Sequence, residues 1–290
     1  MLKIAFDPIY KHHLKIGHRF PMEKYELIPE NLLRKNICNS DNFFSPTPIE
    51  KQLLLSTHDE GYYNNLINLS LSKLHTRQIG FPLSEALIMR EHVIAQGTIQ
   101  NTRYAQQYGV SMNIAGGTHH AFRDRPGAFC MLNDQAIAAN YLINNDLAKR
   151  VMIVDLDVHQ GDGTASIFEH QDSVFTISFH GHKNYPFKKQ NSDFDLPFDD
   201  NTEDRAYLDA LEYHLPRLVD LVEPDFMFYL AGVDVLKTDK LGRLGLSMAG
   251  CKARDRFVLT LCKDQNIIGL SGRTLGQRFK RRATFDHRRS

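Results

Sequence analysis

Short apolar runs recur along the chain, and each is followed directly by glycine or by a polar residue. Runs four to six residues long that are rich in β-branched and aromatic residues are typical of buried strands. Segments with helical periodicity separate them, which predicts an α/β fold built on a parallel sheet. The predicted strands cover residues 3–6, 110–115, 151–154, 174–179, 226–231 and 267–270.

Three intervening segments have clear helical signals. Residues 84–108 predict a helix that Gly109 closes, and Asn133 is placed to cap a helix that runs to about residue 144. In residues 208–222, apolar side chains recur at spacings of three and four, which predicts an amphipathic helix. Pro216 lies inside that helix and predicts a kink or a weak point. Residues 180–200 are rich in Asn, Asp and Pro, so we expect a loop there.

The composition is that of a soluble globular protein of one domain. The 290 residues include 42% hydrophobic and 24% charged residues, and no linker or internal repeat divides them. No apolar stretch reaches the roughly 18 residues that a membrane span needs, and the N-terminus lacks the features of a signal peptide. The four cysteines have no paired metal-binding spacing, so we expect reduced thiols in or near the core of a cytoplasmic protein.

The formal net charge of +1 hides an uneven distribution. Seven basic residues and one acid follow Gly272, whereas residues 1–272 contain 28 basic and 33 acidic residues, a net charge of −5. We therefore divide the chain into a domain, residues 1–272, and a basic tail, residues 273–290, that is disordered or altered. A solvated tail explains this charge without nucleic acid, so we expect no nucleic-acid partner.

Asp157 and His159 follow the strand predicted at 151–154, and Asp234 follows the strand predicted at 226–231. The carboxyl ends of parallel strands meet at one edge of a sheet, where ligands bind. Two carboxylates and one imidazole leave coordination positions open for water and substrate, as in catalytic zinc sites. Each acid alone could equally cap a helix, but the whole pattern predicts a site for a divalent ion. Zinc and ferrous iron both suit these ligands.

His119 and His120 follow Gly116 and Gly117 at the end of the strand predicted at 110–115. Adjacent histidines reach one cavity only if the backbone curls around it, and two glycines permit such a turn. Histidines are suited to taking a proton from water and passing one to a leaving group. The pair therefore predicts general acid–base chemistry beside the metal. Alone, such a pair is more often found on the surface, and we expect His58, His75, His92 and His214 at surface or capping positions.

These motifs together resemble the histone deacetylase superfamily of zinc-dependent amidohydrolases, and most closely its class IV type and bacterial relatives. The resemblance runs from Phe6-Asp7-Pro8 to about Leu270. It is carried by HRFPM (18–22), GGTHHAFRDRPGAFCMLND (116–134), DLDVHQGDGT (155–164), TISFHG (176–181) and AGVDVLKTDKLGRLGLS (231–247). It implies the arginase/deacetylase fold, a single parallel β-sheet with helices on both faces.

The resemblance also assigns roles to individual residues. It implies zinc on Asp157, His159 and Asp234. His119 and His120 would be the catalytic imidazoles, with Asp155 behind the first and Asp162 behind the second. His120 would be the principal acid and base, and His119 would support it electrostatically. Gly127 and Phe129 would line the acyl-lysine tunnel, with Tyr185 or Phe187 at its rim. A monovalent cation, usually K⁺, would lie near Asp155 and take oxygens from Asp157, His159, Ser178 and Phe179.

The implied activity is hydrolysis of the amide of an acylated lysine or an acylated polyamine. Members of the family carry a glycine-rich segment with a catalytic tyrosine directly after the last strand, but this chain has no tyrosine after Tyr229. We therefore expect an impaired enzyme whose natural C-terminus is truncated or altered. The alternative is a non-catalytic member that binds acyl-lysine or metal. A two-manganese ureohydrolase is disfavoured because the sequence provides one metal triad. Acyl length and oligomeric state stay open.

Overall fold

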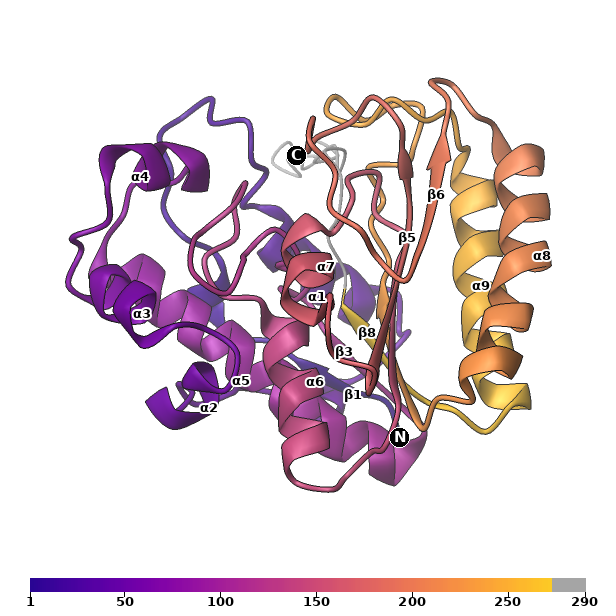
Figure 1. Ribbon diagram of the computed structural model, residues 1–290, viewed down its shortest axis with the longest axis horizontal. Helices are drawn as coiled ribbons and strands as arrows, with labels where there is room; N and C mark the ends of the chain where they lie inside the picture. Colours follow the sequence, from indigo (N-terminus) through magenta and orange to yellow (C-terminus); the bar gives the residue numbers. More distant parts are fainter. Residues whose placement is uncertain (273–290) are drawn as a thin grey trace, which may run out of the picture.

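The computed structural model describes residues 1–272, in which eight strands form one sheet (Figure 1). All the strand pairs are parallel, and the order across the sheet is β2-β1-β3-β8-β7-β4-β5-β6. All six predicted strands form, which confirms the α/β class. The strands are β1 (Lys3–Ala5), β2 (Phe43–Phe44), β3 (Val110–Asn113), β4 (Val151–Asp155), β5 (Val174–Gly181), β6 (Phe194–Phe198), β7 (Phe226–Leu230) and β8 (Ile268–Gly272).

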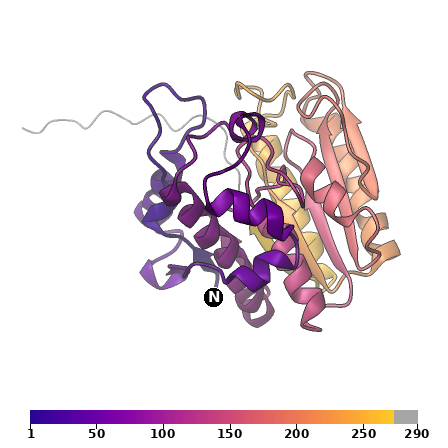
Figure 2. The ribbon, with the colours of Figure 1, turned by 60° about the vertical axis from the view of Figure 1, so that its left-hand side comes forward.

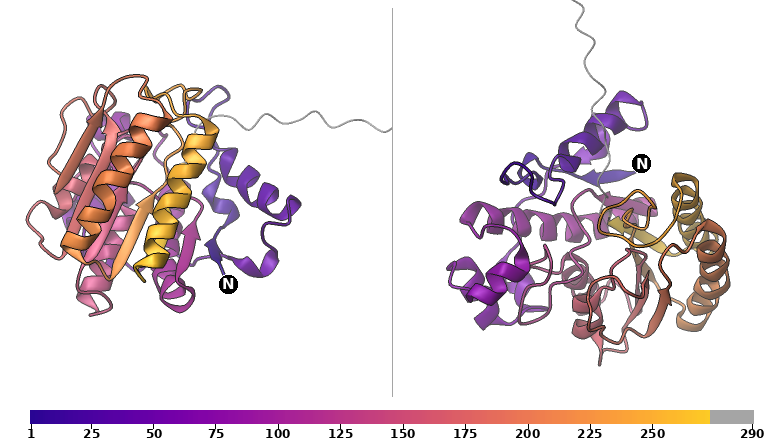
Figure 3. Two further views of the ribbon diagram at one scale, coloured as in Figure 1. Left: turned by 90° about the vertical axis from the view of Figure 1, so that its right-hand side faces the viewer. Right: turned by 90° about the horizontal axis from the view of Figure 1, so that it is seen from above.

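Helices cover both faces of this sheet, as predicted. α8 and α9 lie side by side on one face (Figures 1 and 3), and α5, α6 and α7 lie on the other, with the shorter N-terminal helices outside α5 (Figure 2). The helices are α1 (Lys24–Arg34), α2 (Lys51–Leu55), α3 (Glu60–Ile67), α4 (Lys73–Ile79), α5 (Glu85–Tyr108), α6 (Asp134–Asn144), α7 (Asp162–Phe168), α8 (Asp204–Val222) and α9 (Met248–Asp264), with short 3₁₀ turns at Pro8–Tyr10 and Ser40–Asn42.

The sheet separates two hydrophobic cores. Ile153 and Phe228 belong to the core under α5 and α6, whereas Met152 and Tyr229 belong to the core under α8 and α9. Successive residues of β4 and β7 thus enter opposite cores, and every residue of these two strands is buried. Burial on both faces explains why the central strands read as unbroken apolar runs in the sequence.

The predicted helix ends are confirmed, and the predicted amphipathic helix forms with Pro216 inside it. Asn133 caps α6 by accepting the backbone N–H of Ala136, and Gly109 ends α5 with φ of 84°, a value that favours glycine. α8 runs without interruption from Asp204 to Val222 through Pro216. Packing of its buried residues, including Leu211 and Leu215, against the sheet compensates for the hydrogen bond that proline removes.

The prediction that residues 180–200 form no element is wrong, because β5 extends to Gly181 and β6 occupies Phe194–Phe198. β6 pairs with β5 at the edge of the sheet, where the proline at position 197 is tolerated. Side chains hold the approach to this strand: Thr176 donates its backbone N–H and hydroxyl to Asp193, and Gln160 donates to Asp195. These long-range contacts are invisible in the local composition.

His58 and His92 are buried, so neither lies at the surface, the first of the two kinds of position expected for them. His58 Nε2 accepts the backbone N–H of Asn133 at 3.0 Å, and its Nδ1 lies 2.9 Å from the carbonyl of Phe122. The neutral ring satisfies both partners, with Nδ1 as the donor. Burial lowers the pKa of His58 to about 4, although the hydrogen bonds to the backbone oppose the shift.

This lowered pKa makes stability depend on pH. The unfolded chain takes up a proton on His58 below about pH 6.5, whereas the folded protein does so only near pH 4. The free energy of unfolding therefore decreases as the pH is lowered from 6.5 to 4, by up to about 3 kcal/mol. We expect His58→Gln to be less stable than the unchanged protein at pH 7.5, and the difference to shrink towards pH 4.5. Urea unfolding at several pH values measures it. His170→Gln, at an exposed position, is the control, and a difference that stays constant with pH would contradict the prediction.

All four cysteines are free thiols, and Cys130, Cys251 and Cys262 are buried, in agreement with the prediction. Within residues 1–272, no helix combines the length and apolar character that crossing a membrane requires.

Candidate metal and catalytic site

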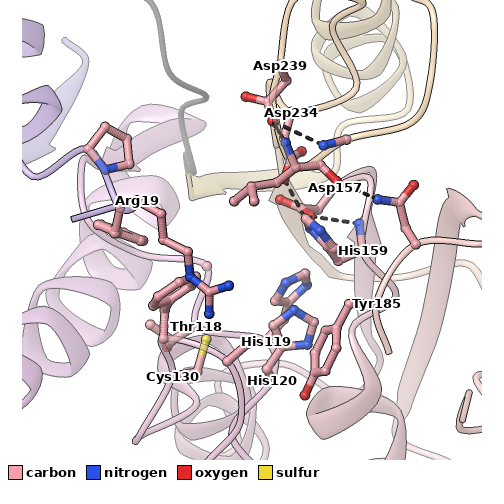
Figure 4. Close-up of a pocket in the computed structure, with 18 of the residues that line it drawn as sticks. Arg19, Thr118, His119, His120, Cys130, Asp157, His159, Tyr185, Asp234 and Asp239 are labelled. Atoms are coloured by element: carbon pink, nitrogen blue, oxygen red, sulfur yellow. Dashed lines mark hydrogen bonds and ion pairs between the residues drawn. The ribbon is translucent and has the colours of Figure 1, made fainter. Parts of the chain in front are cut away.

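The loops after β3, β4 and β7 converge on one cavity of about 730 Å³ at the carboxyl edge of the sheet. β4 and β7 are hydrogen-bonded neighbours, with Asp155 opposite Leu230, so the loops that follow them start side by side. This topology brings Asp157, His159 and Asp234 to one wall of the cavity and the pair His119 and His120 beside them (Figure 4). Both predicted constellations therefore share one site.

Asp157, His159 and Asp234 form a compact group. One ligand atom of each lies within 4.8 Å of those of the other two. His159 Nδ1 is 3.0 Å from Asp157 Oδ1 and 3.2 Å from Asp234 Oδ2. Asp157 is buried and the other two are partly buried, so the group faces the cavity from a largely enclosed wall. The donor set of two carboxylates and one imidazole suits a divalent ion and leaves positions open.

The two carboxylates of this group favour a positive charge between them. Burial opposes ionisation of Asp157, but hydrogen bonding from His159 and the charge of His119 outweigh burial and hold its pKa far below the usual value. Burial and the negative charge of Asp157 raise the pKa of Asp234. Burial disfavours protonated His159, yet its hydrogen bonds to the two carboxylates raise its pKa to about 10. Protonated His159 places a positive charge between the two acids, and a bound metal ion would place its positive charge at the same group.

Backbone contacts fix the carboxylates. Asp157 Oδ1 accepts the N–H of His159 at 2.9 Å, and Asp234 Oδ1 accepts the N–H of Val158 at 3.2 Å. Gly232 allows the two loops to approach, because a Cβ at this position would lie 2.4 Å from Asp157 Oδ2. Arg254 of α9 is fully buried and donates from Nη1 to the carbonyls of Leu156 and Gly232 at 3.0 and 2.6 Å. One guanidinium thus ties together the two loops that carry the acids.

Each histidine of the adjacent pair is backed by its own carboxylate, as predicted. His119 Nδ1 lies 2.5 Å from Asp155 Oδ2, and His120 Nδ1 lies 2.6 Å from Asp162 Oδ1. All four side chains are buried. The ring centroids of the two histidines are 4.1 Å apart, so a charge on one ring is felt by the other. A carboxylate on Nδ1 leaves Nε2 of each ring for chemistry in the cavity.

The two histidines differ in basicity. Burial disfavours protonation of His119, but the charge and hydrogen bond of Asp155 outweigh it and raise the pKa to about 9. Burial and the positive charge of His119 lower the pKa of His120 to about 4, despite Asp162. Near neutral pH this arrangement favours one charged ring and one neutral ring, which is the division expected of an electrostatic group beside a base.

Asp134 holds the turn that carries the histidines. Its Oδ1 accepts the backbone N–H groups of Gly117 and Thr118 at 2.9 and 2.8 Å, and also the Thr118 hydroxyl. Gly117 has φ of 96°, a value that favours glycine, so it permits the turn as expected. The sequence places Asp134 inside a recognisable motif, but a role for it emerges only from these contacts.

Aromatic residues form the other walls of the cavity. Phe129 lines it, whereas Gly127 is not among the lining residues and packs against the backbone of His120. Tyr185 also lines the cavity, with its ring edge-on to His120 at a centroid distance of 4.9 Å. Phe187 is 91% exposed at its mouth. The two candidates for the rim thus divide between the inner wall and the entrance.

Lys189 secures the turn that carries Tyr185. Its Nζ donates to the carbonyls of Asn184 and Pro186 at 2.6 and 2.7 Å. Asn184 in turn donates to the carbonyl of Leu241, in the loop after Asp234. The aromatic wall and the loop of the third metal-site residue are therefore connected, a link that no sequence motif indicates.

The residues assigned to the monovalent cation also lie close together. Asp155 and Ser178 face each other on β4 and β5, and the Ser178 hydroxyl is 3.0 Å from His180 Nδ1. The buried side chain of Phe179 has no oxygen, so this residue would contribute its backbone carbonyl oxygen. The cation site stays a prediction. The segment in which the family tyrosine is missing lies after Gly272, outside the described residues.

Comparison with known proteins agrees with this geometry. Residues 18–272 match the family model for the histone deacetylase domain. An uncharacterized protein of Picosynechococcus is 39% identical over 259 residues, which cover 89% of this chain and 86% of that protein. Histone deacetylase 2 of Arabidopsis thaliana is 27% identical over 86% of this chain and 67% of its own length.

Solved structures show the same fold. An HDAC homologue from Aquifex aeolicus superposes with a TM-score of 0.81 at 24% identity, over 95% of this chain and 79% of the homologue. A structure described as an HDAC homologue complexed with SAHA gives a TM-score of 0.81 at 25% identity, over 94% and 79% of the respective chains. The family match over most of the length shows that this chain belongs to the histone deacetylase family.

Proposed function

We propose that this protein is a zinc-dependent deacylase that hydrolyses the amide bond of an acylated lysine or a similar acylated amine. The observation that carries this proposal is the meeting of Asp157, His159 and Asp234 with two His–Asp pairs in one cavity. Metal ligands, a base and a second charged imidazole are the groups that metal-assisted amide hydrolysis requires.

The residues present fit zinc. One ligand atom each from two carboxylates and one imidazole lie within 4.8 Å of one another, and all three side chains line the cavity. Zinc held there by Asp157, His159 and Asp234 would supply a Lewis acid that polarises an acyl carbonyl and lowers the pKa of water. Ferrous iron suits the same ligands, so the identity of the metal is part of the test.

The chain's own residues would move the protons. His120, neutral and backed by Asp162, would accept a proton at Nε2 from the attacking water and return it to the departing amine nitrogen. His119, paired with Asp155, would keep its positive charge and favour the negative charge that develops on the acyl oxygen. Asp155 and Asp162 would orient the rings and hold the proton on Nδ1.

Phe129 and Tyr185 would enclose the aliphatic stem of the substrate. Both rings line the cavity, the Tyr185 ring lies edge-on to His120, and an acylated lysine side chain is an apolar stem with an amide at its end. The HDAC homologue solved with SAHA supports a substrate of this kind. We also propose K⁺ beside Asp155 and Ser178, where it would stabilise the base of the loop that holds Asp157.

A substrate screen with defined metal content tests the proposal. Acetyl-lysine peptides, peptides with longer acyl groups and acetylated polyamines would be incubated with protein loaded with zinc or with ferrous iron, and release of the carboxylic acid measured. Release that requires the metal and disappears with chelator is expected. Tight zinc binding without any released acid would favour the alternative, a binding member of the family, which the missing tyrosine motivates.

We further propose that the missing tyrosine limits turnover. Loss of one oxyanion donor typically costs about 10²–10³ in rate. A variant in which a glycine-rich segment with a tyrosine follows Leu270 should therefore show kcat higher by about that factor. The same segment with phenylalanine is the matched control and should give no gain. Equal rates for all three proteins would show that another group supplies the hydroxyl.

A further inference from the structure

The cavity wall carries a strong excess of basic side chains. Apart from the metal triad, its ionisable lining consists of His119, His120, Tyr25, Tyr185 and Cys130, one acid, Asp239, and seven bases, namely Arg19, Lys24, Arg77, Arg90, Lys183, Lys240 and Arg243. Residues 1–272 as a whole carry a net charge of −5. The positive charge is therefore concentrated at this site against the overall sign of the domain, which calls for an explanation.

Exposure separates the wall from the mouth. Lys24 and Arg90 are buried, and Arg90 forms an ion pair with Glu91. The other five bases are exposed, as is Phe187, so they form the solvent-facing part of the lining, and Arg19 extends from it into the cavity (Figure 4). They come from the segment before α1, from α4 and from the loops after β5 and β7, which lie along the same upper edge of the molecule (Figure 1). We call these five residues the basic mouth: Arg19, Arg77, Lys183, Lys240 and Arg243.

Acids neutralise only part of the basic mouth. Asp200 accepts two hydrogen bonds from Arg243, at 2.9 and 2.6 Å, and lies 4.0 Å from Lys183. Asp239 accepts the backbone N–H groups of residues 241 and 242. These carboxylates are the two acids that the structure places among the basic mouth, and they leave Arg77 and Lys240 uncompensated. Neither Arg77 nor Lys240 forms an ion pair with any residue between 1 and 272.

We propose that the basic mouth selects acylated lysines that lie in acidic protein segments and rejects acylated polyamines. This inference rests on the deacylase function proposed above and specifies its substrate. A polyamine acylated at one nitrogen keeps protonated amines a few ångströms from the amide, within the Debye length of about 8 Å at physiological ionic strength. The basic mouth repels those charges and attracts carboxylates that flank a lysine.

Matched substrates test this selection. We would compare an acetyl-lysine peptide flanked by aspartates, the same peptide flanked by lysines, and acetylspermidine, using zinc-loaded protein at low and high salt. At low salt, kcat/KM for the acidic peptide should exceed that for the basic peptide by about tenfold or more, and the ratio should fall towards one at high salt. Fluorescence anisotropy with labelled forms of both peptides would give their dissociation constants independently of turnover.

Charge reversal at the mouth provides the decisive variant. Arg77→Glu combined with Lys240→Glu should invert the ratio between acidic and basic peptides in both kcat/KM and binding. Lys149→Glu, at an exposed lysine before β4 on the opposite edge of the sheet, is the control and should keep the original ratio. An unchanged ratio in the double variant, or acetylspermidine as the preferred substrate, would overturn the inference. Charge-selective peptide binding without hydrolysis would uphold the basic mouth and refute the deacylase function.

Discussion

For the proposed zinc-dependent deacylase, we expect replacement of Asp157 by alanine to abolish zinc binding and to lower kcat/KM by at least about 10³-fold. The metal supplies several kcal/mol of transition-state stabilisation, and about 4 kcal/mol corresponds to this factor. The variant also separates His159 from one of the two carboxylates that flank it, since Asp157 Oδ1 lies 3.0 Å from His159 Nδ1. Zinc per chain by elemental analysis and kcat/KM on an acetyl-lysine peptide measure the two effects.

The control for this change is Asp172→Ala. Asp172 is exposed and precedes β5, at the opposite edge of the sheet from the cavity. It should keep one zinc per chain and the original kcat/KM. Thermal unfolding of both variants without metal separates a loss of ligand from a loss of fold. Full zinc occupancy in a folded Asp157→Ala protein would show that the metal binds elsewhere.

Replacing His120 by alanine will lower kcat by about 10²–10⁴-fold while zinc stays bound. General acid–base catalysis contributes a factor of this size, and His120 is not one of the three side chains of the metal group. Retained zinc distinguishes this variant from Asp157→Ala. Single-turnover rates and elemental analysis on the same preparation make the measurement.

Two further variants specify the role of His120. Asp162→Asn should lower kcat by about 10–100-fold, because the carboxylate only orients the ring and raises its basicity. His170→Ala, at an exposed position at the end of α7, should have no effect. A larger loss for His119→Ala than for His120→Ala would reverse the proposed division of roles between the two rings.

The local sequence was sufficient for the central strands and for the longest helix. β4 and β7 are buried on both faces, so their apolar runs are continuous and their ends are marked by Asp155 and Gly232. Ser84, which caps α5, directly precedes the helix in the chain, and Gly109, which ends it, directly follows. Signals of this kind depend only on neighbours in sequence, which is why they can be read without coordinates.

Edge elements and buried polar residues were not predictable in the same way. β6 is a strand because β5 offers it an edge, although it contains Pro197 and lies in a stretch rich in Asn, Asp and Pro. His58 is buried because the carbonyl of Phe122 and the N–H of Asn133, both more than sixty residues away, satisfy its ring. Packing and long-range hydrogen bonds decide such positions, and neither is encoded in the immediate flanking residues.

The sequence by itself identified the residues on which the proposed chemistry depends, because Asp157, His159, Asp234 and the two histidines follow strands with clear apolar runs. Only the tertiary structure decided how those groups act together. The parallel sheet brings loops from distant parts of the chain to one edge, where Arg254 joins two of them. Inside the buried site, Asp155 raises the pKa of His119, and the resulting charge adds to burial in lowering the pKa of His120, while five exposed bases line the same cavity. Proximity, desolvation and charge density are properties of the folded chain.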